Sequence, residues 1–200
     1  MKLTTNTQQI TAEQKAIAEL IEGSEVIRQT ALCLSPAIVT VVEHMIDVLR
    51  TGGKILICGN GGSAADAQHF AAELVGRFRR KRPSWSAIAL TVDASILTSL
   101  GNDFGFEQIF ARQVQALGRP GDILVAISTS GHSKNVLAAV EVATSLGIKT
   151  VGMTGEGTSL LSELVDHHLP IPSANTAFIQ QAHMAVIHVF CELIEESLTS

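Results

Sequence analysis

The sequence predicts an α/β fold: a three-layer, doubly wound, parallel five-stranded sheet with helices on both faces and additional N-terminal helices. Short segments that are apolar throughout alternate with helical segments, as in a parallel sheet buried on both sides. Loops rich in glycine and serine follow two of these segments, at the sheet edge where such folds bind ligands. The 200 residues, 46% of them hydrophobic, suit a single domain over residues 1–200.

The N-terminal quarter of the chain predicts two amphipathic helices between Thr11 and Arg50, because apolar residues recur there at helical spacing. Ser35-Pro36 is expected to break between them, with Pro36 in the first turn of the second helix. Gly52-Gly53 ends the segment. We therefore expect residues 1–52 to form a helical extension that packs on the domain and on neighbouring subunits.

The remainder alternates between strands and helices. The expected strands are 54–58, 86–90, 122–127, 149–154 and 165–170. The expected helices are 64–77, 106–117, 133–146 and 176–197. Apolar faces left over on the N-terminal helices and the last helix favour an oligomer interface, although core packing would produce the same pattern.

Composition and charge narrow the partners and the compartment. A formal net charge of −5 argues against nonspecific binding to nucleic acid, while a local nest of N–H groups can still bind an anionic metabolite. The first residues have no apolar signal core, and the three cysteines have no C-x-x-C spacing. No uninterrupted apolar run is judged long enough to span a bilayer. We expect a cytoplasmic protein with no nucleic-acid or membrane partner.

The first glycine-rich loop, Cys58-Gly59-Asn60-Gly61-Gly62-Ser63, lies between an apolar strand and a helix. At such a helix start the backbone N–H groups are unpaired and the helix dipole favours an anion. The loop lacks the third glycine and the acidic residue of a dinucleotide site, and the Lys-Ser/Thr of a P-loop. A tight turn that needs glycine for its positive φ explains it equally well.

The second loop is more specific. Its hydroxyls are those of Ser128, Thr129, Ser130 and Ser133, and hydroxyls together with exposed amides can surround three phosphate oxygens. Ordinary N-capping would account for one or two hydroxyls, not four. Two such loops on one parallel sheet predict a site for a phosphorylated small molecule.

Titratable residues follow the first loop and recur on the last helix. His69 and Glu73 are four residues apart and share a helix face. Gln180 and His188 are two turns apart and roughly share a face, whereas His183 points elsewhere by the helical period and is expected to pack. A lone His–Glu pair is usually a surface pair, so its position after a candidate phosphate loop gives it weight.

Asp93, Asp103 and Arg77 each allow a structural and a functional interpretation. Asp93 and Asp103 could orient sugar hydroxyls or start turns. The basic run 77–82 is expected to be solvated, except that Arg77, nearest the helix, is a candidate ligand contact.

Five motifs in order carry a family resemblance over nearly the whole chain. They are residues 58–63, 69–74, 101–105, 127–131 and 179–188. Together they resemble bacterial phosphoheptose isomerases, which are built on a sugar isomerase (SIS) domain. The resemblance implies conversion of sedoheptulose 7-phosphate to D-glycero-D-manno-heptose 7-phosphate for the heptose of lipopolysaccharide core. It also implies a homotetramer with shared active sites and one zinc ion per subunit.

The resemblance also implies roles for individual residues. The implied sugar-phosphate contacts, with Arg77 and Asp93 added from the reasoning above, are Asn60, Gly61, Gly62, Ser63, Glu73, Arg77, Asp93, Asn102, Asp103, Ser128, Thr129, Ser130, Ser133 and Gln180. The implied zinc ligands are His69, Glu73, Gln180 and His188. Ketose–aldose isomerisation needs a base for a carbon-bound proton and a partner for the oxygens, which we assign to Glu73 and His188.

The metal set and the family pattern each raise a reservation. Gln180 and His188 are about 12 Å apart along their helix, so Gln180 is a weak or absent ligand, and zinc could support structure without driving proton transfer. Ala177 stands where some members have an acid, and Phe178 and Gln181 also depart from common family residues. The chain therefore lacks that acid at this position.

Two alternatives to this enzyme remain open. One is a non-catalytic SIS protein, either a sugar-phosphate sensor or a scaffold that binds the bacterial replication initiator. The other is a different sugar-phosphate isomerase on the same domain. Glu73 and His188 favour the enzyme, because the scaffold relative lacks the glutamate and the final histidine.

Overall fold

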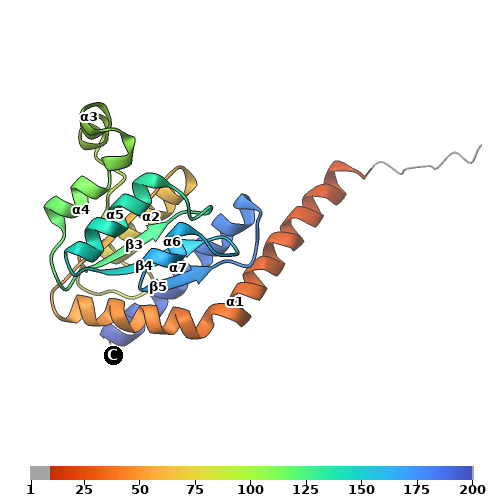
Figure 1. Cartoon of the computed structure of the whole chain (residues 1–200). Helices are drawn as coiled ribbons and strands as arrows, with labels where there is room; N and C mark the ends of the chain where they lie inside the picture. The colour runs from red at the N-terminus through yellow and green to blue at the C-terminus, as the bar shows by residue number, and fades with distance from the viewer. Residues whose placement is uncertain (1–9, 200) are drawn as a thin grey trace, which may run out of the picture.

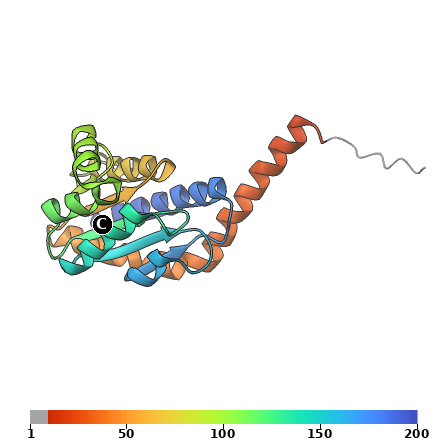
Figure 2. The ribbon, with the colours of Figure 1, turned by 45° about the horizontal axis from the view of Figure 1, so that its top comes forward.

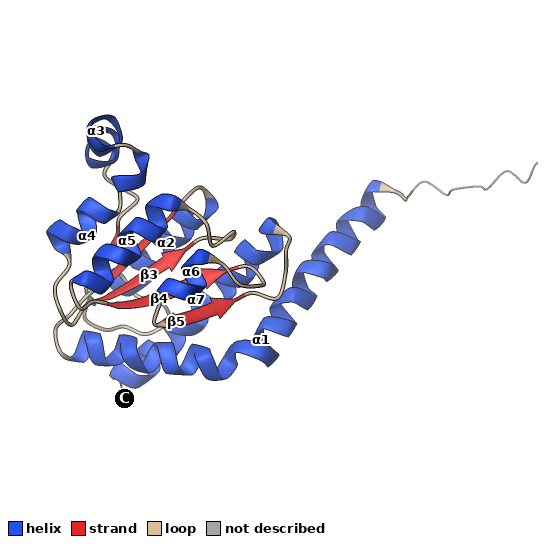
Figure 3. Ribbon diagram, viewed as in Figure 1, coloured by secondary structure: helices blue, strands red, loops and turns tan. Residues whose placement is uncertain are grey.

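A computed structural model describes residues 10–199 and contains one five-stranded parallel sheet (Figures 1 and 3). The strands are β1 (Ile55–Gly59), β2 (Ala87–Ala89), β3 (Ile123–Ile127), β4 (Lys149–Thr154) and β5 (His167–Pro170). Their order across the sheet is β2-β1-β3-β4-β5, and every pair is parallel. This confirms the predicted parallel five-stranded sheet.

Helices cover both faces of the sheet. One layer contains α1 (Ala12–Arg50), α2 (Gly62–Val75) and α7 (Thr176–Thr199), which bury alternate strand residues such as Ile55 and Ile57. The other contains α4 (Ala111–Leu117), α5 (Lys134–Ser145) and α6 (Leu160–Leu164), which bury the intervening residues such as Leu56 and Cys58. Because successive strand side chains point to opposite faces, fully apolar strands support both layers, and the three-layer prediction is confirmed.

The N-terminal segment forms one helix, α1, so the predicted break at Ser35-Pro36 is wrong. Proline removes its own N–H bond from the helix and its ring crowds the carbonyl of the residue four positions earlier. The buried residues Leu34 and Ile38 lie on both sides of Pro36, and their packing holds the helix together. The Ser35 hydroxyl donates to the carbonyl oxygen of Ala31 within the same turn. The C-terminal part of α1 packs on α7 and β5, and the N-terminal part projects away from the domain (Figures 1 and 2).

The segment after β2 also differs from expectation. An unpredicted helix, α3 (Ala94–Phe104), comes first, followed by a 3₁₀ turn, Phe106–Gln108, and then α4. Asp93 begins α3 by accepting the N–H of Ile96 at 2.9 Å, and Gly105, with φ +87°, ends it. None of the α3 residues, all of them in the described chain, is buried, so the pattern of core residues could not reveal this helix.

Two helices, α1 and α7, are apolar and long enough to cross a membrane by length and composition. Polar residues such as Glu43 in α1 and Gln181 in α7 interrupt both helices, so this finding does not contradict the expectation about uninterrupted apolar runs. Half of the most apolar window of α7 is buried inside the domain, as core packing of that helix requires. In α1 a third of the corresponding window is buried.

Candidate active site

The two predicted loops lie side by side at the carboxyl edge of the sheet. β1 and β3 are neighbours, and their last residues, Gly59 and Ile127, are paired in register. The chain reverses its direction of winding between these strands, which is where doubly wound sheets bind ligands. Asn60 and Asn135 exchange two amide hydrogen bonds of 2.8 Å, which join the first loop to α5.

The first loop leaves the N-terminus of α2 open. Gly61 has φ +56°, which favours glycine, and no side chain of the described residues caps this helix. A Cβ on Gly62 would collide with the side chain of Gln180. The loop therefore brings Gln180 of α7 against the first residue of α2. The same loop thus contains both a turn that favours glycine and a helix N-terminus that no described side chain caps.

Among the described residues, the second loop likewise leaves the N-terminus of α5 without a side-chain cap. Ser133 is the N-cap of α5, yet within the described chain its side chain makes no capping bond. It instead shares a hydrogen bond of 2.9 Å with the buried hydroxyl of Ser128, while Ser130 is exposed. N-capping thus explains none of these hydroxyls, which supports the prediction of an anion site.

The side chains of α2 and α7 meet beside these loops. His69 Nε2 lies 3.1 Å from His188 Nε2 and 3.2 Å from Glu73 Oε1. The side chain of His69 is 44% exposed and that of Glu73 is 23% exposed, so both are open to a bound molecule. The cluster holds a carboxylate and two imidazoles, the groups that move protons at neutral pH.

The distances from His69 Nε2 to His188 and Glu73 can be compared with the ligand spacing of a zinc site. Ligands about 2.0–2.2 Å from tetrahedral zinc lie about 3.3–3.6 Å apart, slightly more than the two distances of 3.1 and 3.2 Å from His69 Nε2. However, residues 10–199 contain no group of three or more histidine, cysteine, aspartate or glutamate side chains already arranged to hold a metal. The donor types and two of the spacings fit zinc, and the full set of ligands is not assembled in this chain.

Comparison with known proteins places the chain among proteins of similar sequence and fold. A family model described as the SIS domain matches residues 20–155. Phosphoheptose isomerase of Roseiflexus sp. (strain RS-1) is 53% identical over 182 residues, which are 91% of this chain and 92% of that protein. The chain belongs to the phosphoheptose isomerase family.

Two solved phosphoheptose isomerase structures extend this result to the fold. The one from Neisseria gonorrhoeae is 41% identical, with a TM-score of 0.88 over 93% of this chain and 100% of its own. The one from Francisella tularensis is also 41% identical, with a TM-score of 0.90 over 93% of this chain and 99% of its own. The chain is thus an α/β isomerase of this family.

Some residues that the family resemblance implied are not brought together within this chain. Asn102 and Asp103 lie on α3 and bond to each other at 2.8 Å, and among the described residues neither bonds to the loops. Arg77 is exposed, with no hydrogen bond or ion pair within 10–199. Asp93 caps α3, which agrees with its reading as a structural residue.

The family-specific departures lie at the start of α7. Phe178 is buried, and a Cβ on Gly23 of α1 would collide with the side chain of Gln181. These two residues therefore pack the helix start against α1. Ala177 offers no carboxylate to the site, so a helper acid at this position is absent.

Sequence reasoning missed several buried polar residues near the site. Asp66, one turn before His69, is 8% exposed and has one carboxylate oxygen without a partner; burial raises its pKa to about 6, opposed by the charge of His69. Arg82 and Glu195 form a buried ion pair, although Arg82 belongs to a run expected to be solvated. The sequence contains one weak indication of this role: Glu195 is seven residues after His188, so the two residues share a face of the helix.

His183 was expected to pack, and the structure confirms this. Its ring is fully buried and its Nε2 lies 3.2 Å from the carbonyl oxygen of Thr154. Burial lowers its pKa to about 4, so the ring is neutral near pH 7 and Nε2 donates to Thr154.

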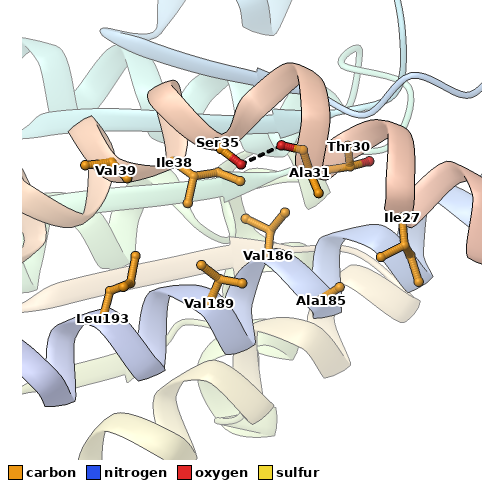
Figure 4. Close-up of a pocket in the computed structure, with 10 residues that line it drawn as sticks. All are labelled: Ile27, Thr30, Ala31, Ser35, Ile38, Val39, Ala185, Val186, Val189 and Leu193. Carbon is orange, nitrogen blue, oxygen red and sulfur yellow. Dashed lines mark hydrogen bonds between the residues drawn. The ribbon is translucent and has the colours of Figure 1, made fainter.

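Two of the cavities in the structure can be compared with the position of the site: one lies at the first loop and the other lies between α1 and α7. One of about 190 Å³ lies at the first loop, where Asn60 and Gly61 face residues of α3 and of the segment before α4. The other, of about 240 Å³, is an apolar groove between α1 and α7 (Figure 4). Its lining contains none of the predicted site residues, so it is separate from the chemistry.

Proposed function

We propose that the chain interconverts sedoheptulose 7-phosphate and D-glycero-D-manno-heptose 7-phosphate, for the heptose of lipopolysaccharide core. The observation that carries the proposal is the contact of His69, Glu73 and His188 beside two helix N-termini without side-chain caps. The family's phosphoheptose isomerases supply the substrate class.

The phosphate is proposed to bind at the second loop. The amides at the start of α5 and the hydroxyls of Ser128, Thr129, Ser130 and Ser133 would donate to its oxygens. Asn60, Gly61, Gly62, Ser63 and Gln180 would then contact the sugar near the first loop. In this orientation the reacting carbons would lie at the Glu73 cluster.

The isomerisation is proposed to proceed through an enediol. Glu73 takes a proton from carbon 1 of the ketose while the oxygen on carbon 2 gains one, giving the enediol. Protonated Glu73 returns its proton to carbon 2, and the hydroxyl on carbon 1 loses its proton to form the aldehyde. His188 carries the protons of the oxygens, so the protons balance over the cycle.

Zinc is proposed as a cofactor, one ion per subunit. His69, Glu73 and His188 would hold it, with Gln180 as a fourth and weaker ligand. When bound, zinc would stabilise negative charge on the enediolate oxygens. Glu73 cannot serve the same carbon-bound proton and the metal through one oxygen, so the two roles would use different carboxylate oxygens.

The assembly and compartment are further parts of the proposal. We infer a homotetramer with shared active sites, since among the described residues Asn102 and Asp103 make no bond to the loops of their own chain and a neighbour could present them. The apolar groove between α1 and α7 (Figure 4) supports an interface. A cytoplasmic location without membrane or nucleic-acid partners remains our expectation.

The test is an assay for aldose formation from sedoheptulose 7-phosphate, with metal-free protein and with added zinc. Turnover that rises with zinc supports the isomerase and the metal. Turnover that is the same with and without zinc supports the isomerase and contradicts the proposal of a zinc cofactor. Binding without turnover in either sample would contradict the proposal and favour a sugar-phosphate sensor or an isomerase of a different sugar phosphate.

A further inference from the structure

A buried ion pair joins α7 to the loop that follows α2. Arg82 Nε lies 3.0 Å from Glu195 Oε1, and each side chain is only 1% exposed. A pair this deeply buried is costly to desolvate and is weak evidence for stability alone. Its hydrogen bonds show what it holds in place.

Glu195 fixes the backbone of the loop. Its carboxylate accepts N–H bonds from Phe78 at 2.9 Å, Arg79 at 2.9 Å and Arg80 at 2.8 Å. With Arg82, four donors from one short loop converge on one carboxylate. These bonds lower the pKa of Glu195 against the effect of burial, so the group is an anion at neutral pH.

Arg82 fixes the end of α2, where Glu73 lies. Its guanidinium donates to the carbonyl oxygens of Glu73 at 2.7 Å and Leu74 at 2.8 Å, which have no partner within the helix. A cation at a helix C-terminus is also favoured by the helix dipole. The guanidinium lies 3.6 Å from the ring centroid of Trp85, which fixes its plane.

Phe78 connects the loop to His188. Its ring stacks on the imidazole of His188 with centroids 5.5 Å apart and planes inclined by 30°. The guanidinium of Arg79 lies 5.0 Å from the same ring and pairs with Glu192 of α7 at 2.9 Å. The loop thus touches both residues of the proposed acid–base pair.

We propose that Arg82 and Glu195 are positioning residues of the isomerase, which hold Glu73 through its backbone carbonyl and His188 through Phe78. The inference rests on the proposed function for the roles of Glu73 and His188. Neither Arg82 nor Glu195 touches the substrate in this scheme. Their loss should therefore lower kcat more than it changes KM.

The first test compares Glu195→Gln with Asp122→Asn. Asp122 is a matched control, because its buried carboxylate also pairs with a cation, Lys54 at 2.7 Å, and accepts backbone N–H bonds from Lys54 and Arg119. It lies at the opposite edge of the sheet from the site. Both variants are assayed well below their melting temperatures.

We expect Glu195→Gln to lower kcat at least tenfold with KM within twofold, and Asp122→Asn to leave kcat within twofold. Equal kcat in the two variants at matched stability would overturn the inference. If Glu195→Gln does not fold, Phe78→Leu decides, because it keeps the backbone bonds to Glu195 and removes the stacking. It should also lower kcat at least threefold, and an unchanged kcat would overturn the link to His188.

A second readout does not depend on turnover. The ring of Phe78 should shift the His188 Hε1 resonance upfield in metal-free protein, and Glu195→Gln should reduce that shift while Asp122→Asn leaves it unchanged. An unchanged shift in Glu195→Gln contradicts the inference. If the wild type fails to isomerise the heptose phosphate but the shift behaves as expected, the proposed function fails and the positioning role stands.

Discussion

At the scale of single residues, the proposed chemistry depends on Glu73. Glu73→Gln keeps the shape of the side chain and removes its ability to take a proton. We expect kcat to fall by about two to four orders of magnitude, the contribution of a positioned general base, with substrate affinity nearly intact. Turnover and calorimetric titration with sedoheptulose 7-phosphate measure the two effects.

The control for this change is Glu141→Gln, at an exposed position on α5, which should leave kcat unaltered. Full activity in Glu73→Gln would remove Glu73 as the base. A large loss of affinity with little loss of kcat would instead make it a binding residue.

His183 provides a residue-scale prediction for pH. Its pKa in the folded protein is lowered to about 4 from an ordinary value of 6.5. The neutral ring therefore contributes stability that is present above pH 6.5 and is lost as pH falls toward 4. The full shift corresponds to about 3 kcal/mol.

His183→Gln keeps a donor for Thr154 and cannot gain a proton in this range. The stability of the wild type relative to this variant should therefore fall between pH 7 and pH 4, as measured by denaturant unfolding at each pH. His132→Gln, at an exposed position, is the matched control. A difference between wild type and His183→Gln that does not change with pH would contradict the buried neutral ring.

At the scale of elements, apolar periodicity predicted the strands and the longer helices of the core, because burial imposes that pattern. It did not predict α6, whose five residues are too few to show a period although Leu161 is buried. It also failed at α3 and at Pro36, for different reasons. The helix α3 has no buried residue in the described chain. The helix α1 continues through Pro36 because packing on α7 outweighs the lost backbone bond and the crowding by the proline ring.

In the site, too, the sequence predicts contacts between residues close in the chain and misses contacts between distant ones. His69 and Glu73 could be paired from their spacing on one helix, and the two loops from their place after strands. Arg82 and Glu195 are 113 residues apart, so no local pattern joins them. A basic run is usually solvated, and only the fold shows that this arginine is buried.

The second loop supports a prediction at this scale. Ser130→Ala with Ser133→Ala removes two hydroxyls from the open N-terminus of α5 and leaves its backbone amides. Hydrogen bonds of about 0.5–1.5 kcal/mol each predict a five- to 150-fold loss of substrate affinity, measured by calorimetry, with little change in kcat.

The matched control is Ser145→Ala at the other end of α5, where, among the described residues, the hydroxyl bonds only to the carbonyl oxygen of Val142. It should bind substrate as the wild type does. Unchanged affinity in the double variant would place the phosphate elsewhere.

At the scale of the whole molecule, the fold gathers both loops and the His69 cluster at one edge of the sheet, and the described residues leave at least two apolar surfaces uncovered. One is the groove between α1 and α7 (Figure 4). The other is on the projecting part of α1, where Ile17, Leu20 and Ile21 are 51%, 73% and 62% exposed. Their spacing of three and four residues makes one stripe, which a single chain does not bury.

The proposed tetramer predicts that charge on this stripe separates the subunits. Leu20→Glu with Ile21→Glu would place two carboxylates in an apolar interface, where they cannot be desolvated cheaply. We expect a lower molar mass by light scattering after size-exclusion chromatography, and at least a tenfold loss of turnover because the active sites are shared. Lys15→Glu, an exposed charged position on the same helix, should change neither. An unaltered mass in the double variant would show that the stripe is not an interface, and lower mass with full turnover would show that each subunit has a complete site.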